Sequence, residues 1–170
     1  MTIIPGVIWV VLIALWESAG LPVPGLLGAA ADLALLVVLM WAYARNPADA
    51  IILAVVGGVT MDVLSGQPLG ITVLALLPAT VVGSIRGARM LDTEWLSTIV
   101  LAAVATMAYH VVLITMLQLT EGGLPIGTLL SQQLLPAIIV NALLAPVVYL
   151  IVWAASFDVR PARRALRTPE

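Results

Sequence analysis

The chain has 170 residues, of which 62% are hydrophobic and only 9% are charged, and its mean hydropathy is +1.16. Soluble domains carry about 25% charged residues, so the polar side chains here are too few to cover a surface that faces water. This composition excludes a soluble globular enzyme, a disordered chain and a nucleic-acid-binding domain. Cysteine is absent and there is one histidine, which excludes disulfides, thiol nucleophiles and histidine-rich metal centres.

Six apolar stretches follow one another along the chain, and each approaches the roughly 20 residues that a membrane-spanning helix needs. They cover residues 3–16, 25–43, 50–64, 69–85, 95–119 and 130–155. Helices are favoured over barrel strands because the stretches are continuously apolar rather than alternating. We predict an all-α integral membrane protein, with a six-transmembrane-helix bundle over residues 1–156 and a basic cytoplasmic tail over residues 157–170. The third and fourth stretches are short and favour a tight helical hairpin.

Arginine placement predicts how the bundle lies in the membrane. With six crossings and a cytoplasmic N-terminus, every basic residue falls on the cytoplasmic side, as the positive-inside rule requires; these residues are Arg45, Arg86, Arg89, Arg160, Arg163, Arg164 and Arg167. Both termini are then cytoplasmic. The basic tail either binds anionic lipid head groups or only sets the orientation. The tryptophans mostly lie near the ends of spans, which predicts interfacial anchors: Trp9, Trp16, Trp41, Trp95 and Trp153.

Asp62 is the most informative polar residue, because a carboxylate within an apolar span is costly and is therefore a functional candidate. It precedes a turn in which Gly66 suits the left-handed position after a helix and Pro68 suits the first turn of the next helix. We predict that Asp62 locks this hairpin by accepting hydrogen bonds from the free N–H groups around Leu69, Gly70 and Ile71, with nearby hydroxyls as secondary partners. A proton- or ligand-binding role and direct contact with a partner remain alternatives.

Three other polar residues lie within the apolar stretches: Asp32, His110 and Asn141. Asp32 lies early in its helix, where the helix dipole favours an anion, and could face either the bundle interior or an outer cavity. We interpret His110 as an interhelical hydrogen-bonding residue, since its own span supplies no titratable partners for a proton relay. Asn141 is expected to bond across helices. No metal-site template, cofactor motif or catalytic constellation is present, which predicts a protein that is not an enzyme.

A sharper pattern surrounds the hairpin: Gly58-x-x-x-Asp62-x-x-Ser65-Gly66-x-Pro68-Leu69-Gly70. Together with the length, the six spans and residues 141–146, this pattern resembles the MreD family of rod shape-determining proteins. The resemblance implies a non-enzymatic protein of the bacterial inner membrane that acts with MreC, beside the actin-like MreB. It also implies an elongation complex with a SEDS glycosyltransferase and a penicillin-binding transpeptidase, which supports peptidoglycan synthesis and cell shape. A fold like the S components of energy-coupling-factor transporters is implied as well.

Three functions compete at this stage. The first is a scaffold of the elongation complex that packs its helices against a partner's transmembrane helix. The second is a substrate-binding, S-component-like subunit of a vitamin transporter, which needs a pocket lined by convergent polar and aromatic groups. Only 5% of residues are aromatic, and these gather at span ends, which disfavours such a pocket. The third is a binder of a lipid or an isoprenoid carrier.

Overall fold

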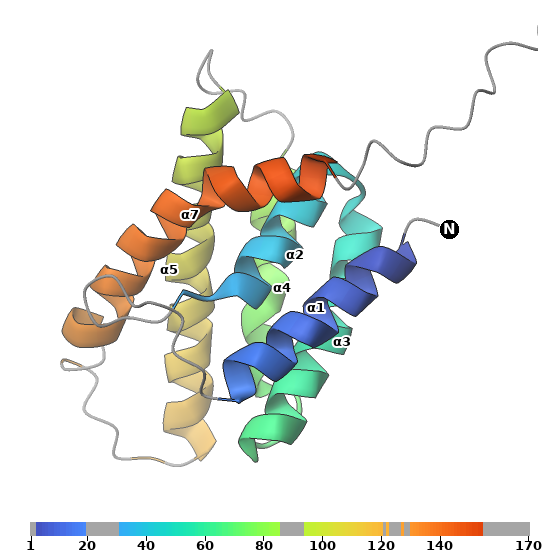
Figure 1. Cartoon of the computed structure of the whole chain (residues 1–170). Helices are drawn as coiled ribbons and strands as arrows, with labels where there is room; N and C mark the ends of the chain where they lie inside the picture. The colour runs from blue at the N-terminus through green and yellow to red at the C-terminus, as the bar shows by residue number, and fades with distance from the viewer. Residues whose placement is uncertain are drawn as a thin grey trace, which may run out of the picture.

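The computed structural model describes residues 3–19, 31–85, 94–120, 122, 127 and 130–154. Within these residues the chain is helical, and η2 is a short π-helical segment that leads into α7. The elements are α1 (Ile3–Ser18), α2 (Leu33–Ala44), α3 (Pro47–Ser65), α4 (Ile71–Ser84), α5 (Glu94–Thr120), η2 (Leu130–Leu134) and α7 (Leu135–Ala154). Successive α-helices run in opposite directions, so the beginning of α1 and the end of α7 lie at the same end of the bundle (Figure 1).

Three helix starts differ from the sequence expectation. Helix α2 begins at Leu33, with Asp32 as its N-cap residue, rather than at residue 25, where the apolar stretch starts. Turn chemistry explains the other two differences. Helix α3 begins at Pro47 rather than at residue 50, because the Asn46 side chain accepts a hydrogen bond from the Ala48 N–H at 3.2 Å and proline fits the first helical position. Helix α4 begins at Ile71, so Pro68 lies in the loop between α3 and α4. The prediction that Pro68 lies in the first turn of the next helix is therefore wrong. The Pro68 carbonyl instead accepts from the Ile71 N–H at 3.4 Å.

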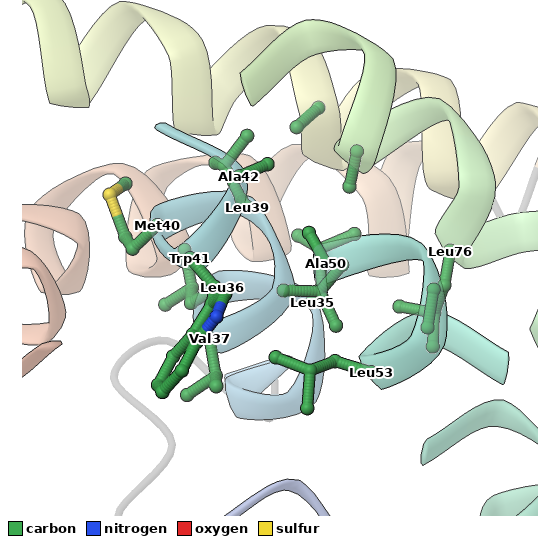
Figure 2. Packing of buried hydrophobic residues seen from close by; sticks show 14 of the residues in the cluster. Leu35, Leu36, Val37, Leu39, Met40, Trp41, Ala42, Ala50, Leu53 and Leu76 are labelled. Carbon is green, nitrogen blue, oxygen red and sulfur yellow. The ribbon is translucent and has the colours of Figure 1, made fainter. Parts of the chain in front are cut away.

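Helix α2 forms the centre of the bundle. It packs against α1, α3, α4, α5 and α7, and its residues 34–42 are all buried. Figure 2 shows its side chains pointing outward on different sides, with Leu35 near Ala50 and Leu53 and with Met40 on another side. A helix that is apolar all round is expected to be buried in this way. The other helices are therefore arranged around α2.

The burial of α2 corrects the expectation for one tryptophan. Trp41 lies on this central helix and is only 2% exposed, so it is a core residue and not an interfacial anchor. The other four tryptophans are each about half exposed, at 47–53%. Sequence position alone could not separate them, because Trp41 also lies near the end of an apolar stretch.

Three of the described helices are long and apolar enough to cross a membrane: Pro47–Ser65, Trp95–Thr120 and Gln132–Ala154. Helices α1, α2 and α4 have 16, 12 and 14 residues, or about 24, 18 and 21 Å at 1.5 Å per residue, against a hydrocarbon core of about 30 Å. Large apolar side chains are exposed on the outer faces of α1, α3, α5 and α7. The chain is thus an all-helical membrane protein, whereas the count of six spans and the boundary at residue 156 stay predictions.

Glycines allow the closest helix contacts. A Cβ atom at Gly58 would lie 2.6 Å from the backbone nitrogen of Val73 on α4, and one at Gly83 would lie 2.6 Å from the carbonyl oxygen of Leu39 on α2. The α3–α4 and α2–α4 backbones therefore touch at these two positions. Small residues are the usual means of such close approach between membrane helices.

Candidate functional site

The first polar site is the contact between Asp62 and the start of α4. Asp62 is fully buried in the last turn of α3, and its Oδ2 accepts from the Gly70 N–H at 2.6 Å while its Oδ1 accepts from the Thr72 N–H at 3.0 Å. These N–H groups belong to the helix start, where the backbone has no intrahelical partner and the dipole favours an anion. The predicted capping contact is present. Of the three predicted donors Gly70 is the one used, and the second donor is Thr72 rather than Leu69 or Ile71.

The turn residues hold this contact in place. Gly66 follows α3 with φ +68° and Gly70 precedes α4 with φ +100°, both in the left-handed region that favours glycine. The prediction of a left-handed Gly66 is confirmed. The Ser65 hydroxyl donates to the Met61 carbonyl at 2.7 Å and lies 3.4 Å from the Asp62 carbonyl, so it satisfies the end of α3 and not the Asp62 carboxylate.

The second polar site lies at the start of α2, and we call it the polar cluster: Glu17, Asp32, Thr106, His110 and Asn141. Glu17 Oε1 accepts from the Leu33 N–H at 2.6 Å and from the Ala34 N–H at 3.3 Å. Asn141 Oδ1 accepts from the Asp32 N–H at 3.0 Å. Side chains of α1 and α7 therefore cap the first N–H groups of α2. The side chain of Asp32, the N-cap residue of α2, forms no capping hydrogen bond.

Asn141 connects three helices within this cluster. It is fully buried on α7, and its Nδ2 donates to Asp32 Oδ2 at 3.0 Å and to Thr106 Oγ1 on α5 at 3.1 Å. With the bond to the Asp32 N–H, three of the four hydrogen-bonding positions of this amide are used. The prediction that Asn141 bonds across helices is confirmed. Asp32 could face either the bundle interior or an outer cavity, and in the structure it faces the interior.

His110 faces Asp32 across the same cluster. Its Nδ1 lies 3.0 Å from the Thr106 carbonyl oxygen, and because a carbonyl only accepts, Nδ1 must carry the proton. Its Nε2 lies 3.8 Å from Asp32 Oδ2. In a neutral ring the Nε2 lone pair then faces a carboxylate oxygen, so the two groups attract each other only when one further proton resides on the ring or on the carboxyl.

The structure changes the interpretation of His110 and adds Glu17 to the site. His110 forms its hydrogen bond within its own helix and not with a neighbouring helix. Its charged neighbour, Asp32, lies at the start of α2, so a search of the histidine's own span could not find it. Glu17 was not among the polar residues singled out from the sequence. The signal was available, because Glu17 and Asp62 are both acids in the last turn of a helix that another helix follows. In the part of the chain that the structure describes, no three acidic or histidine side chains are grouped to hold a metal ion.

Arg45 is the one residue of the predicted basic set that the structure describes. It ends α2, where its N–H donates to the Trp41 carbonyl at 2.9 Å, and its guanidinium lies 4.7 Å from the centroid of the Trp41 ring. This distance is within the range of a cation–π interaction. The remaining members of the set lie outside the described residues: Arg86, Arg89, Arg160, Arg163, Arg164 and Arg167.

Comparison with known proteins adds one finding. No curated protein and no solved structure matches the chain. The model of one family, described as rod shape-determining protein MreD, matches residues 1–154. The match includes all the helices described above, with the Asp62 cap and the polar cluster. The chain therefore belongs to the MreD family of rod shape-determining proteins.

Proposed function

We propose that this protein is a non-enzymatic scaffold of the bacterial cell-elongation complex. Membership of the MreD family carries a role in rod shape determination. The proposal adds the way in which the chain fulfils that role: it binds MreC within the inner membrane and so supports peptidoglycan synthesis. The elongation transpeptidase and the SEDS glycosyltransferase join the same complex, and MreB is reached indirectly.

The observation that carries the proposal is the use of the polar groups inside the bundle. Both oxygens of Asp62, the amide of Asn141 and one oxygen of Glu17 are bound to backbone or side-chain groups of neighbouring helices. A catalytic site instead presents a nucleophile, a base and an electrostatic stabiliser to a common substrate position. These polar groups join helices, which suits a rigid bundle that holds its neighbours.

The same geometry supports a placement in the membrane. The beginning of α1, the end of α2 and the end of α7 lie at one end of the bundle, and the α3–α4 turn lies at the other (Figure 1). Arg45 is the C-cap residue of α2. Basic residues favour the cytoplasmic side. We therefore place both termini in the cytoplasm and the α3–α4 turn on the outer side, with six crossings of the inner membrane.

A partner helix would pack against the exposed apolar faces. Residues spaced three or four apart on α5, such as Val100, Val104, Met107 and Val111, are 46–56% exposed, and similar faces lie on α1 and α3. Association in lipid depends on close packing and a few polar contacts, and lipid covers the faces that no partner uses. The vitamin-transporter alternative gains nothing from the structure, because the groove described below is lined by apolar side chains, whereas a vitamin pocket needs convergent polar groups.

Single cysteines test the placement directly, because the natural chain has none. Leu69 in the hairpin turn is 72% exposed, and Ala48 at the start of α3 is exposed at the opposite end. In intact cells we expect a membrane-impermeant maleimide to label Leu69→Cys and not Ala48→Cys, and we expect both to react after the membrane is permeabilised. The reverse labelling would overturn the orientation.

Recovery of MreC tests the scaffold itself. Purification of the tagged chain from native membranes in mild detergent is expected to recover MreC in a stoichiometric complex. Cell width and length after depletion and re-expression report whether the complex works. A purified chain that binds a vitamin tightly and recovers no MreC would overturn the proposal.

A further inference from the structure

A groove runs along the outer side of α2, between α1 and α7. Its volume is about 200 Å³. We define the α2 groove by its floor residues Leu33, Val37 and Trp41 and by side chains of α1 and α7 that include Trp9 and Ile151. The floor residues are four apart, so the floor follows one stripe of the helix over about 12 Å at 1.5 Å per residue.

The floor of the groove is buried, whereas its rim faces outward. Val37 and Trp41 are 7% and 2% exposed, but Trp9 on α1 and Ile151 on α7 are each 47% exposed. Figure 2 shows the Trp41 ring beside Val37 on the same side of α2. In a membrane protein, this rim borders the hydrocarbon of the bilayer. An α-helix is about 10 Å wide, so the groove has room for an extended chain and not for a whole helix.

A positive charge lies at one end of the groove. The Arg45 guanidinium is 4.7 Å from the centroid of the Trp41 ring, at the end of α2 that we place on the cytoplasmic side. A phosphate at this end would supply a negative charge for the guanidinium.

We propose that the α2 groove binds an anionic phospholipid of the inner leaflet, with one acyl chain lying along Leu33, Val37 and Trp41 and the phosphate at Arg45. The apolar lining selects a hydrocarbon chain, and the charge at one end fixes the direction of the lipid and selects an anionic head group. The site lies away from the Asp62 cap. The direction of the lipid rests on the proposed membrane placement, but the binding does not depend on MreC.

The test measures lipid bound to the purified chain by native mass spectrometry, with phosphatidylglycerol and phosphatidylcholine as probes. Three variants and one control are compared. Val148→Phe fills the groove, because Val148 lines it and is 8% exposed. Ile151→Trp narrows the mouth at an exposed position. Arg45→Gln removes the charge. Val81→Phe, on the exposed face of α4, adds the same bulk away from the groove.

We expect Val148→Phe and Ile151→Trp to lose both lipids, and Val81→Phe to bind as the natural chain does. Arg45→Gln is expected to weaken the binding of phosphatidylglycerol by about fivefold, as for one basic contact with an anionic lipid, and to leave the binding of phosphatidylcholine unchanged. Unaltered lipid binding in both groove variants would overturn the site, and equal binding of the two lipids by the natural chain would overturn head-group selection. If the groove variants lost MreC and kept lipid, the groove would be assigned to contact with MreC instead. Circular dichroism confirms that each variant is folded, and the exposed position of Ile151 provides a second variant if Val148→Phe is not.

Discussion

Two helices of this bundle begin in the same way but are capped from different distances. The start of α4 is capped by Asp62, which lies eight residues before Gly70 and ten before Thr72. The start of α2 is capped by Glu17, which lies 16 residues before Leu33, and by Asn141, which is 109 residues from Asp32. One cap is complete within a hairpin, and the other needs α1, α2 and α7 to be assembled.

The two caps also differ in how fully they use their carboxylates. Both oxygens of Asp62 accept a hydrogen bond, whereas Glu17 Oε2 is buried without a partner among the described residues. Asp62 is fully buried, and Glu17 is only partly so. An unsatisfied buried group costs more than a group that water can reach. The hairpin cap should therefore contribute more to stability, and the α2 cap should tolerate more change.

The largest expected effect is at Asp62. Replacing Asp62 with Leu leaves the part-buried Gly70 N–H and the buried Thr72 N–H without an acceptor, and at about 1–3 kcal/mol for each such donor the loss is about 2–6 kcal/mol. Asp62→Asn keeps one acceptor oxygen and should lose about half as much. Unfolding of the purified chain in mild detergent, followed by circular dichroism, measures both.

The order of the two variants is the critical result. If Asp62→Leu unfolded at the same denaturant concentration as the natural chain, Asp62 would not hold the hairpin. If Asp62→Asn were as damaging as Asp62→Leu, the negative charge would matter more than the hydrogen bonds, and the proton- or ligand-binding alternative would gain support.

The next effect is at Gly58, which allows the two helices of the hairpin to touch. A methyl group there would lie 2.6 Å from the Val73 nitrogen, and because this neighbour is backbone, α3 and α4 must move apart. Overpacking of this kind costs about 1–3 kcal/mol. Gly127→Ala is the matched control, since nothing lies within 4 Å of the added atom and Gly127 has no positive φ. Equal stability of Gly58→Ala and the natural chain would show that the contact is looser than the structure has it.

The same contrast between local and distant contacts explains what the sequence could predict. The Asp62 cap, the left-handed Gly66 and the hairpin follow from residues within one short segment, so their pattern alone indicated them. The α2 cap combines residues from three helices, and no spacing along the chain indicates that Glu17 and Asn141 meet at the start of α2.

The central position of α2 was hidden for a related reason. Its side chains are apolar on every side, but so are those of lipid-exposed helices, and composition does not tell burial in protein from burial in lipid. Trp41 was therefore read as an anchor although it lies in the core. The start of α3 was missed because Asn46 and Pro47 were treated as the end of one helix, when they are also the N-cap and first residue of the next.

A smaller effect is expected at Glu17. Glu17→Leu removes the acceptor of the Leu33 and Ala34 N–H groups, and the usual cost of losing a helix N-cap is about 1 kcal/mol. Glu17→Gln keeps an acceptor oxygen and should be close to the natural chain. Hydrogen exchange of the first α2 amides reports the loss locally, while α4 amides serve as the internal control. Faster exchange at α4 than at α2 would contradict the assignment of this cap.

The smallest effect on stability is expected at Asp32. Asp32→Asn keeps an oxygen that can accept from Asn141 Nδ2, so the change should be about 0.6 kcal/mol or less, as for a single polar contact between membrane helices. The informative readout is His110, because it is the single histidine of the chain and gives one set of ring nitrogen signals. Nitrogen-15 NMR should show a protonated Nδ1 in both proteins, since the Thr106 carbonyl holds that proton. Asp32 Oδ2 both accepts from Asn141 Nδ2 and faces His110 Nε2, so Asp32→Asn, which keeps an oxygen there for Asn141, removes the negative charge beside Nε2. We therefore expect the Nε2 signal to shift while the Nδ1 signal stays in place. A neutral ring protonated only on Nε2 would contradict the bond to Thr106.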